Sequence, residues 1–147
     1  MKSNPQTEKI YSAAKMGDAE AQYSLGGRYY CAEDDSQDYA EAFKWYCRAA
    51  EQGHAGALDM VARMYRDGDG VSQNYETSVK IYWESAKLGC SDAYGHLSYM
   101  YAGGMGVQKD ENVAKLLMDE ARRGFYKESI VHDPEGFVES IRNILKI

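Results

Sequence analysis

A serine and a lysine near the start of the chain have the spacing of a catalytic pair. Ser12 and Lys15 are separated by two residues, as in penicillin-recognising enzymes, where the lysine helps to activate the serine nucleophile. That chemistry also requires Ser-Asp-Asn and Lys-Thr-Gly motifs. The chain has Ser91-Asp92-Ala93 in place of the first and lacks the second. We therefore expect no catalysis through this pair.

A glycine-rich run is the second candidate. Gly103-Gly104-Met105-Gly106 could in principle cradle a phosphate. A P-loop, however, follows a strand and ends in Gly-Lys-Ser/Thr, and a dinucleotide fold needs βαβ units. Neither pattern is present, so the run predicts a tight turn between helices.

Three histidines and an acidic run are candidate metal ligands. No pair among His54, His96 and His132 has the His-x-x-x-His spacing, and a zinc site needs about four converging ligands. The run 33–38 lacks the glycine and the final glutamate of a calcium loop. It predicts a solvated loop with Ser36 or Asp38 as a helix N-cap, or alternatively a contact patch for a basic partner. We expect no metal and no cofactor.

These residues lie on elements that repeat along the chain. Gly17, Gly53, Gly89 and Gly124 each follow an alanine-containing helix end, at intervals of 36, 36 and 35 residues. Ser12 to Lys15 lies in the first of these helix ends, so its motif belongs to the repeat. After each of the first three glycines, an alanine follows at four residues, a leucine or valine at eight and a tyrosine at twelve. Residues four apart lie on one face of a helix. These positions are Ala21, Leu25, Tyr29; Ala57, Val61, Tyr65; and Ala93, Leu97, Tyr101.

Each repeat is predicted to contain a helix A, a turn, a helix B and a glycine cap. The predicted packing face of helix B in repeat one contains Ala42, Trp45, Tyr46, Ala49 and Ala50. Its counterparts are Ser78, Ile81, Tyr82, Ser85 and Ala86 in repeat two, and Val113, Leu116, Leu117 and Ala121 in repeat three, with one deletion near 110–112. Such hairpins cannot bury their apolar faces alone and must stack. The prediction is one domain, 1–147, with an N-terminal helix at 6–16, repeats at 17–52, 53–88 and 89–123, and a C-terminal capping helix at 134–146. The alternative for that last helix is a tail that docks on a partner.

The repeat has a family resemblance. The pattern Ala-x-x-x-Leu-Gly-x-x-Tyr, a Gly-x-Gly-Val turn, an acidic residue and Trp-Tyr-x-x-Ala-Ala-Glu-x-Gly resembles the Sel-1-like repeat, a relative of the tetratricopeptide repeat. It covers roughly residues 6 to 124. The resemblance implies an all-α, right-handed α-solenoid of antiparallel helix pairs, a tetratricopeptide-like superhelix with helix A on its concave side. Repeat one differs from the family pattern at its turn, 32–37. Repeat two differs from it at Ala62, where the family favours glycine.

The same analogy selects the residues that face the concave groove. They lie two before, two after and five after the Leu25-type core position, with an acidic residue near the rim. Tyrosine and arginine are enriched among interface hot spots. The predicted partner-binding residues are Glu20, Tyr23, Tyr30, Asp59, Arg63, Arg66, Asp92 and Tyr99. The alternative is that they are ordinary solvent-facing residues.

Charge and cysteine content indicate which classes of partner and which cellular compartment are favoured. The net charge of −6 disfavours nucleic acid and anionic membrane surfaces and is compatible with a basic protein. The N-terminus lacks an apolar signal segment, and no apolar run is long enough to span a bilayer. Cys31, Cys47 and Cys90 are an odd number at unrelated spacings, so they predict reduced thiols in a cytoplasm.

The leading functional prediction is a noncatalytic module that binds another protein through its concave helix A face. Stand-alone bacterial proteins that resemble it include regulators and immunity proteins that neutralise toxins. The alternatives are a β-lactamase-like hydrolase, as described for some secreted relatives, and a self-associating structural piece.

Overall fold

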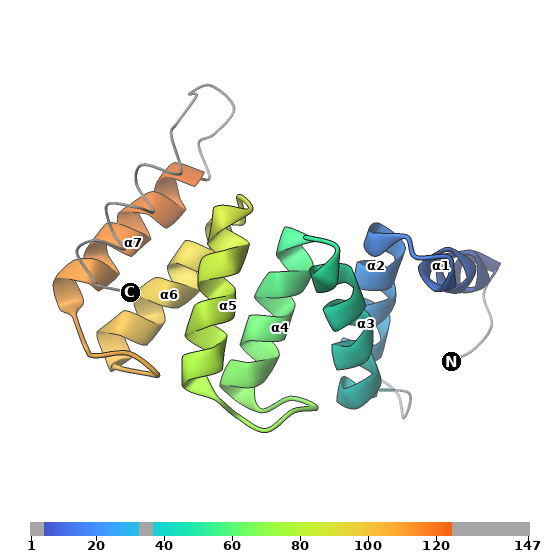
Figure 1. Cartoon of the computed structure of the whole chain (residues 1–147), viewed down its shortest axis with the longest axis horizontal. Helices are drawn as coiled ribbons and strands as arrows, with labels where there is room; N and C mark the ends of the chain where they lie inside the picture. The colour runs from blue at the N-terminus through green and yellow to red at the C-terminus, as the bar shows by residue number, and fades with distance from the viewer. Residues whose placement is uncertain (1–4, 33–36, 125–147) are drawn as a thin grey trace.

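The computed structural model describes residues 5–32 and 37–124. Within these ranges the chain forms seven α-helices and no β-strand, which confirms the all-α prediction. The helices follow one another from α1 at one end of the molecule to α7 at the other (Figure 1). They are α1 (Pro5–Lys15), α2 (Ala19–Tyr30), α3 (Tyr39–Glu51), α4 (Ala55–Asp67), α5 (Tyr75–Lys87), α6 (Ser91–Gly103) and α7 (Glu111–Gly124).

The helices pack as successive hairpins. The pairs α2–α3, α4–α5 and α6–α7 make the most extensive contacts, and α1–α2, α3–α4 and α5–α6 join each unit to the next. This arrangement confirms the predicted α-solenoid. We call the contact of α2–α3 with α4–α5 the first junction and that of α4–α5 with α6–α7 the second junction. The predicted C-terminal helix at 134–146 lies outside the described residues, as does the acidic segment 33–36.

Short polar side chains define where the helices begin. Asp38 and Asn74 cap α3 and α5, each accepting a hydrogen bond from the backbone N–H three residues later. Asp38 is thus one of the two N-caps expected from the acidic run. Asp110 accepts in the same way from Val113 ahead of α7. No helix in the described part of the chain combines the length and apolarity needed to cross a bilayer.

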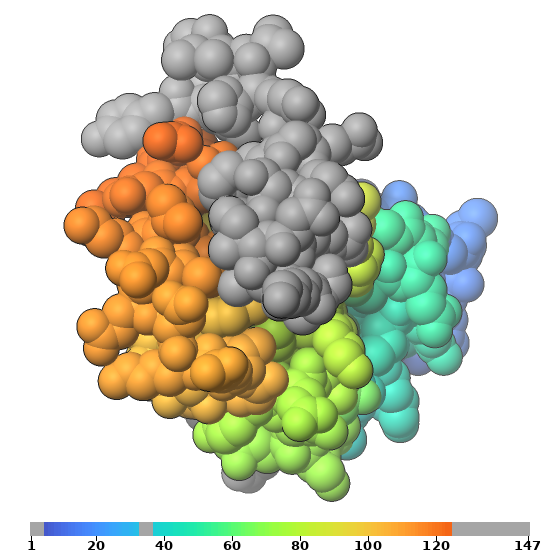
Figure 2. Space-filling model, turned by 60° about the vertical axis from the view of Figure 1, so that its left-hand side comes forward, coloured from blue at the N-terminus to red at the C-terminus, as the bar shows by residue number. Residues whose placement is uncertain are grey.

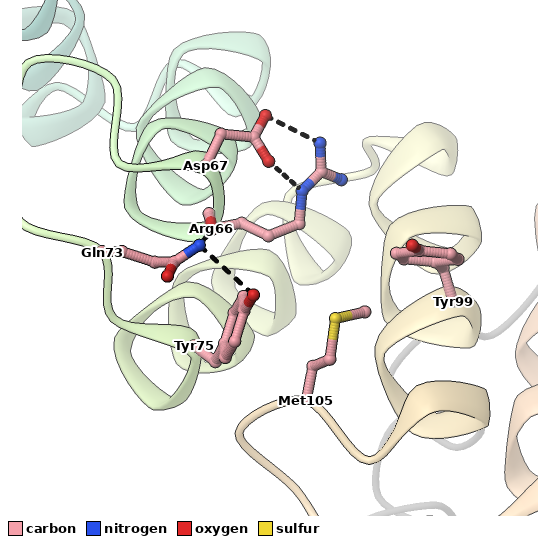
Figure 3. A pocket seen from close by; sticks show the side chains of 6 residues that line it. All are labelled: Arg66, Asp67, Gln73, Tyr75, Tyr99 and Met105. Atoms are coloured by element: carbon pink, nitrogen blue, oxygen red, sulfur yellow. Dashed lines mark hydrogen bonds and ion pairs between the residues drawn. The ribbon is translucent and has the colours of Figure 1, made fainter.

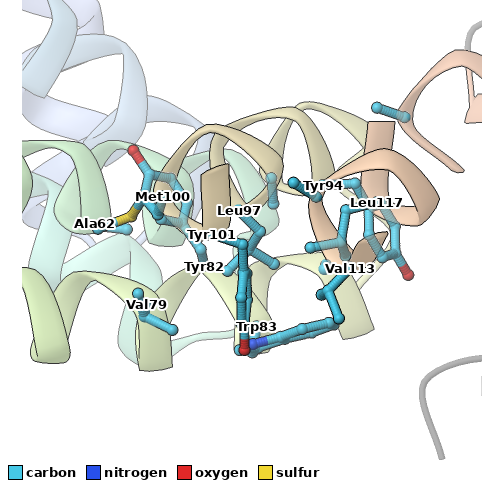
Figure 4. Close-up of a cluster of buried hydrophobic side chains, with 14 residues drawn as sticks. Ala62, Val79, Tyr82, Trp83, Tyr94, Leu97, Met100, Tyr101, Val113 and Leu117 are labelled. Atoms are coloured by element: carbon cyan, nitrogen blue, oxygen red, sulfur yellow. The ribbon is translucent and has the colours of Figure 1, made fainter. Parts of the chain in front are cut away.

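Apolar side chains between the helices form an almost continuous core. One cluster spans α4 to α7 and includes Tyr82, Leu97, Met100 and Leu117 (Figure 4). A second lies between α3 and α4, and a third joins Ala14, Leu25 and Trp45 near α1. The positions of Leu25, Val61 and Leu97 are buried in all three repeats, as their spacing predicts.

The structure corrects one predicted core position on α7. Leu116 is 47% exposed, whereas Val113, Leu117 and Ala121 are buried. Because these three residues are four apart, they share one face of the helix, and Leu116 lies about 100° away from Leu117. Glu120 is buried instead, and its carboxylate pairs with Arg123 at 3.2 Å. Figure 2 shows α7 at one end of the row.

Candidate functional site

All eight predicted partner-binding residues lie on the A helices of the three repeats. Glu20, Tyr23 and Tyr30 are on α2, and Asp92 and Tyr99 are on α6. Asp59, Arg63 and Arg66 come from α4 between them. We call this set of eight the helix A face. Several of its members contact side chains of the neighbouring repeat across the junctions, and these contacts decide what a partner can reach.

At the start of the first junction, His54 organises its neighbours on α2. The His54 Nδ1 accepts the backbone N–H of Ala57 and so caps α4. Its Nε2 therefore carries the proton and donates to the Glu20 carboxylate at 3.0 Å. Tyr23 stacks on the imidazole with ring centroids 4.6 Å apart. Tyr23 is consequently half-buried by packing, while the Glu20 side chain is still 76% exposed.

At the other end of the first junction, Tyr30 is held on several sides. Its hydroxyl donates to Asp69 at 2.7 Å, and its ring lies 5.0 Å from that of Tyr39. The Arg63 guanidinium lies over the same ring at 5.7 Å. Burial and the hydrogen bond to Asp69 raise the pKa of Tyr30 to about 12. Tyr30 thus links α2 to the end of α4.

Removing the Tyr30 hydroxyl gives a first prediction. Tyr30→Phe should lower the free energy of unfolding by about 1 kcal/mol, since a partly exposed hydrogen bond to a carboxylate is lost. Because folding raises this pKa, the hydroxyl's contribution is fully present below pH 10 and falls as the pH rises towards about 12. Urea unfolding of both proteins at pH 8 and pH 11 measures this. A difference that stays constant with pH would contradict the assignment.

At the second junction, charged side chains on α4 form a network with His96 of α6. Arg66 donates from Nε and Nη2 to the Asp67 carboxylate at 2.7 and 3.0 Å, and this pairing holds the pKa of Asp67 below its usual value. The Arg66 Nη1 lies 3.4 Å from His96 Nδ1, and His96 Nε2 lies 3.6 Å from an Asp59 oxygen. His96 also stacks on the buried Tyr82 ring at 4.9 Å.

These contacts change how the helix A face is interpreted. Tyr23 and Tyr30 each pack on a ring from the chain itself, that of His54 and that of Tyr39 respectively. Arg63 and Arg66 are likewise engaged, by Tyr30 and by Asp67 respectively. The most exposed members are Glu20, Asp92 and Tyr99, the last being 62% exposed, whereas the Arg63 side chain is 43% exposed and lies over Tyr30. The site is therefore acidic and aromatic, and its arginines have internal partners.

A pocket of about 530 Å³ lies beside Tyr99. Arg66 and Asp67 form one side of it, and Tyr99 and Met105 project from the other (Figure 3). Gln73 donates from its side-chain nitrogen to the Arg66 carbonyl at 2.7 Å and to the Tyr75 hydroxyl at 3.2 Å. Gln73 and Tyr75 complete the lining of the pocket. The spacing of the repeat alone did not indicate Gln73, Tyr75 or Met105 as residues of the site. A signal was available, because Gln37-x-Tyr39 recurs as Gln73-x-Tyr75.

The residues first considered for catalysis or metal binding have structural contacts. The Lys15 ammonium lies over the Tyr11 ring at 4.5 Å, and Ser12 is exposed on α1. Gly104 caps α6 in the left-handed conformation, so the glycine run is a helix–helix turn. His132 lies outside the described residues. Within the described ranges, no three His, Cys, Asp or Glu side chains group closely enough to hold a metal ion.

The fold and this face define a solenoid of helical hairpins whose A helices carry side chains that contact the neighbouring repeat across both junctions. The Sel1 repeat pattern matches residues 19–54, 55–90 and 91–123. The chain belongs to the Sel1 repeat family, as the resemblance of the sequence indicates, and proteins of this family generally mediate protein–protein interactions. No curated protein matches this chain.

Solved structures of other proteins have the same fold. A Sel1 repeat protein from Oxalobacter formigenes is 28% identical with a TM-score of 0.75, over 79% of this chain and 88% of its own. A protective antigen of uropathogenic Escherichia coli with an SLR fold is 33% identical with a TM-score of 0.74 over 80% of this chain. The match spans only 25% of that antigen's length. Cysteine-rich protein B of Helicobacter pylori, 21% identical with a TM-score of 0.61 over 89% of this chain and 96% of its own, shares the fold.

Proposed function

We propose that this chain is a noncatalytic module that binds another protein along the helix A face. The observation that carries the proposal is the arrangement of this face. Glu20, Asp92 and Tyr99 are open to solvent, while the side chains between them are held in place by contacts across both junctions. A surface whose side chains are already ordered loses little conformational entropy when a partner binds.

The charge of the face favours a basic segment of the partner. Glu20 and Asp92 are exposed carboxylates, and both arginines of the face lie against groups of the chain. The net charge of −6 acts in the same direction at longer range. A basic toxin is one partner of this chemistry. A toxin-neutralising role, a regulatory role and a cytoplasmic location stay predictions.

A pair of variants tests the proposal. Tyr99→Ala with Asp92→Lys removes the exposed ring and reverses an exposed charge, without touching the arginines that brace the junctions. The ligand is the protein that the wild-type chain captures from its native source. We expect its dissociation constant to rise at least tenfold, which is a loss of about 1.4 kcal/mol of binding free energy. Titration calorimetry with that purified partner measures the change.

The matched control changes the other side of the hairpins. Leu116→Ala with Lys80→Glu also removes one exposed apolar side chain and reverses one exposed charge, on α7 and α5. Its affinity should equal that of the wild-type chain. Equal affinity for the helix A face variant and the control would reject the proposal, provided that circular dichroism shows both to be folded.

A further inference from the structure

The pocket beside Tyr99 has a counterpart at the first junction, 36 residues earlier. Gln37 and Gln73 make the same two bonds, one to a backbone carbonyl seven residues back and one to a tyrosine hydroxyl two residues on. The start of α3 is likewise 36 residues from the start of α5. The two junctions therefore share one framework, and their side chains can be compared position by position.

At the first junction this place is filled by a tyrosine of the chain itself. The Tyr30 ring contacts the Tyr39 ring at 5.0 Å and the Arg63 guanidinium at 5.7 Å. Its hydroxyl donates to Asp69 at 2.7 Å. Tyr39, Arg63 and Asp69 therefore surround an aromatic side chain.

At the second junction the equivalent surroundings are present without that ring. Tyr75, Tyr99 and Met105 stand where Tyr39, Arg63 and Asp69 stand, and all three line the pocket. Arg66 replaces Tyr30, but its guanidinium bonds to Asp67 and lies near His96. In Figure 3 Arg66 extends towards Asp67 on one side of the pocket, with Tyr99 and Met105 on the other.

We propose that this pocket binds an aromatic side chain of the partner polypeptide, in the place that Tyr30 fills at the first junction. The inference rests on the proposed function and specifies it further. Tyr75 and Tyr99 offer aromatic surfaces, and the Met105 thioether adds a favourable sulfur–aromatic contact. Because Arg66 and Asp67 neutralise each other, the pocket does not call for a charged group.

The identity of residue 105 selects the probe. Asp69 accepts the Tyr30 hydroxyl, whereas Met105 at the equivalent position is a poor acceptor. A phenylalanine side chain has no hydroxyl to donate, so it loses no hydrogen bond when methionine stands in place of aspartate. N-acetyl-phenylalaninamide is therefore the ligand to test, and N-acetyl-leucinamide is its apolar control.

The experiment follows the Met105 methyl group in the full chain by carbon-13 methionine NMR during titration with each amide. We expect the phenylalanine amide to produce a saturable ring-current shift with a dissociation constant on the order of millimolar. The leucine amide should leave the signal in place. Arg66→Tyr restores the tyrosine of the first junction and should weaken binding at least tenfold, because the pocket is then filled from within.

Tyr99→Ala supplies a second variant that does not depend on refilling the pocket. It removes the Tyr99 ring from one side of the pocket, where the residue is 62% exposed. Binding of the phenylalanine amide should also weaken at least tenfold. An unmoved Met105 signal, equal shifts with both amides, or wild-type affinity in a folded variant would each overturn the pocket assignment.

The two proposals fail separately. If the helix A face variant loses the partner while the amide leaves Met105 unmoved, the face binds protein and the aromatic pocket is wrong. If the amide binds while that variant keeps its partner, the pocket is a real site and the proposed function is wrong.

Discussion

Replacing Gly106 with alanine is expected to destabilise the chain by about 2–5 kcal/mol. Gly106 has a φ of 69°, in the left-handed region that an L-residue adopts only at a cost. A Cβ there would also clash with the carbonyl carbon of Tyr75 and would lie 2.6 Å from the nitrogen of Glu76. Both atoms belong to the backbone at the start of α5, so neither can move aside as a side chain would.

A glycine elsewhere in the repeat separates the two causes. Gly53 has a φ of 80°, but a Cβ on it would meet no atom within 4 Å. Gly53→Ala should therefore cost only the conformational part, about 1–2 kcal/mol. Gly70 is 36 residues before Gly106, and a Cβ on it would come almost as close to the backbone of Tyr39 and Ala40, so Gly70→Ala should behave like Gly106→Ala. Urea unfolding of the three variants measures this. Equal losses for Gly53→Ala and Gly106→Ala would show that the close approach contributes nothing.

This turn also positions the pocket. The Gly106 turn packs directly on the first residues of α5, from which Tyr75 projects into the pocket. A shift of the turn would move Met105 and Tyr75 together. The conformation of one glycine thus connects the stability of the second junction with its binding surface.

Leu97→Ala should lower the free energy of unfolding by about 2–5 kcal/mol. Leu97 is 0% exposed and lies in the cluster shared by α4 to α7 (Figure 4). Truncation removes apolar contacts and leaves a cavity between helices that are packed on several sides. Domains of this size are typically stable by only about 5–15 kcal/mol, so the loss is a large fraction of the total.

The control for Leu97→Ala is the same chemical change on the surface. Leu88, at the C-cap of α5, is 52% exposed, and Leu88→Ala should change stability by no more than about 0.5 kcal/mol. Chemical denaturation monitored by circular dichroism gives both values. If the two variants lost similar amounts, the assignment of Leu97 to the centre of the core would be wrong.

The repeat could be predicted because its signals are local. Leu25, Val61 and Leu97 are buried as their shared position indicates. Asp38 caps α3, since a short acidic side chain before an apolar periodic segment is an N-cap signal. The prediction was wrong for Leu116, which neighbours Leu117 in sequence but faces away from it. Two adjacent leucines do not indicate by themselves which one faces the core.

The candidate site was predictable only in part, because position on a helix does not determine contacts across a junction. The spacing of the repeat places Tyr30, Arg63 and Tyr99 on helices α2, α4 and α6. Whether each side chain is open to solvent also depends on residues 30 or more positions away, which the local pattern does not reveal. Tyr30 is held by Asp69, and Arg66 lies near His96.

The sequence by itself determined the repeat, the helices and the family, because these depend on periodic residues within about 36 positions of one another. Only the tertiary structure decided which members of the helix A face are free. It also revealed the pocket at the second junction, where Arg66 turns to Asp67 and leaves the place that Tyr30 fills at the first. The physical reason is that Tyr30 and Arg66 also contact residues of the next repeat, Asp69 and His96, which only folding brings near them.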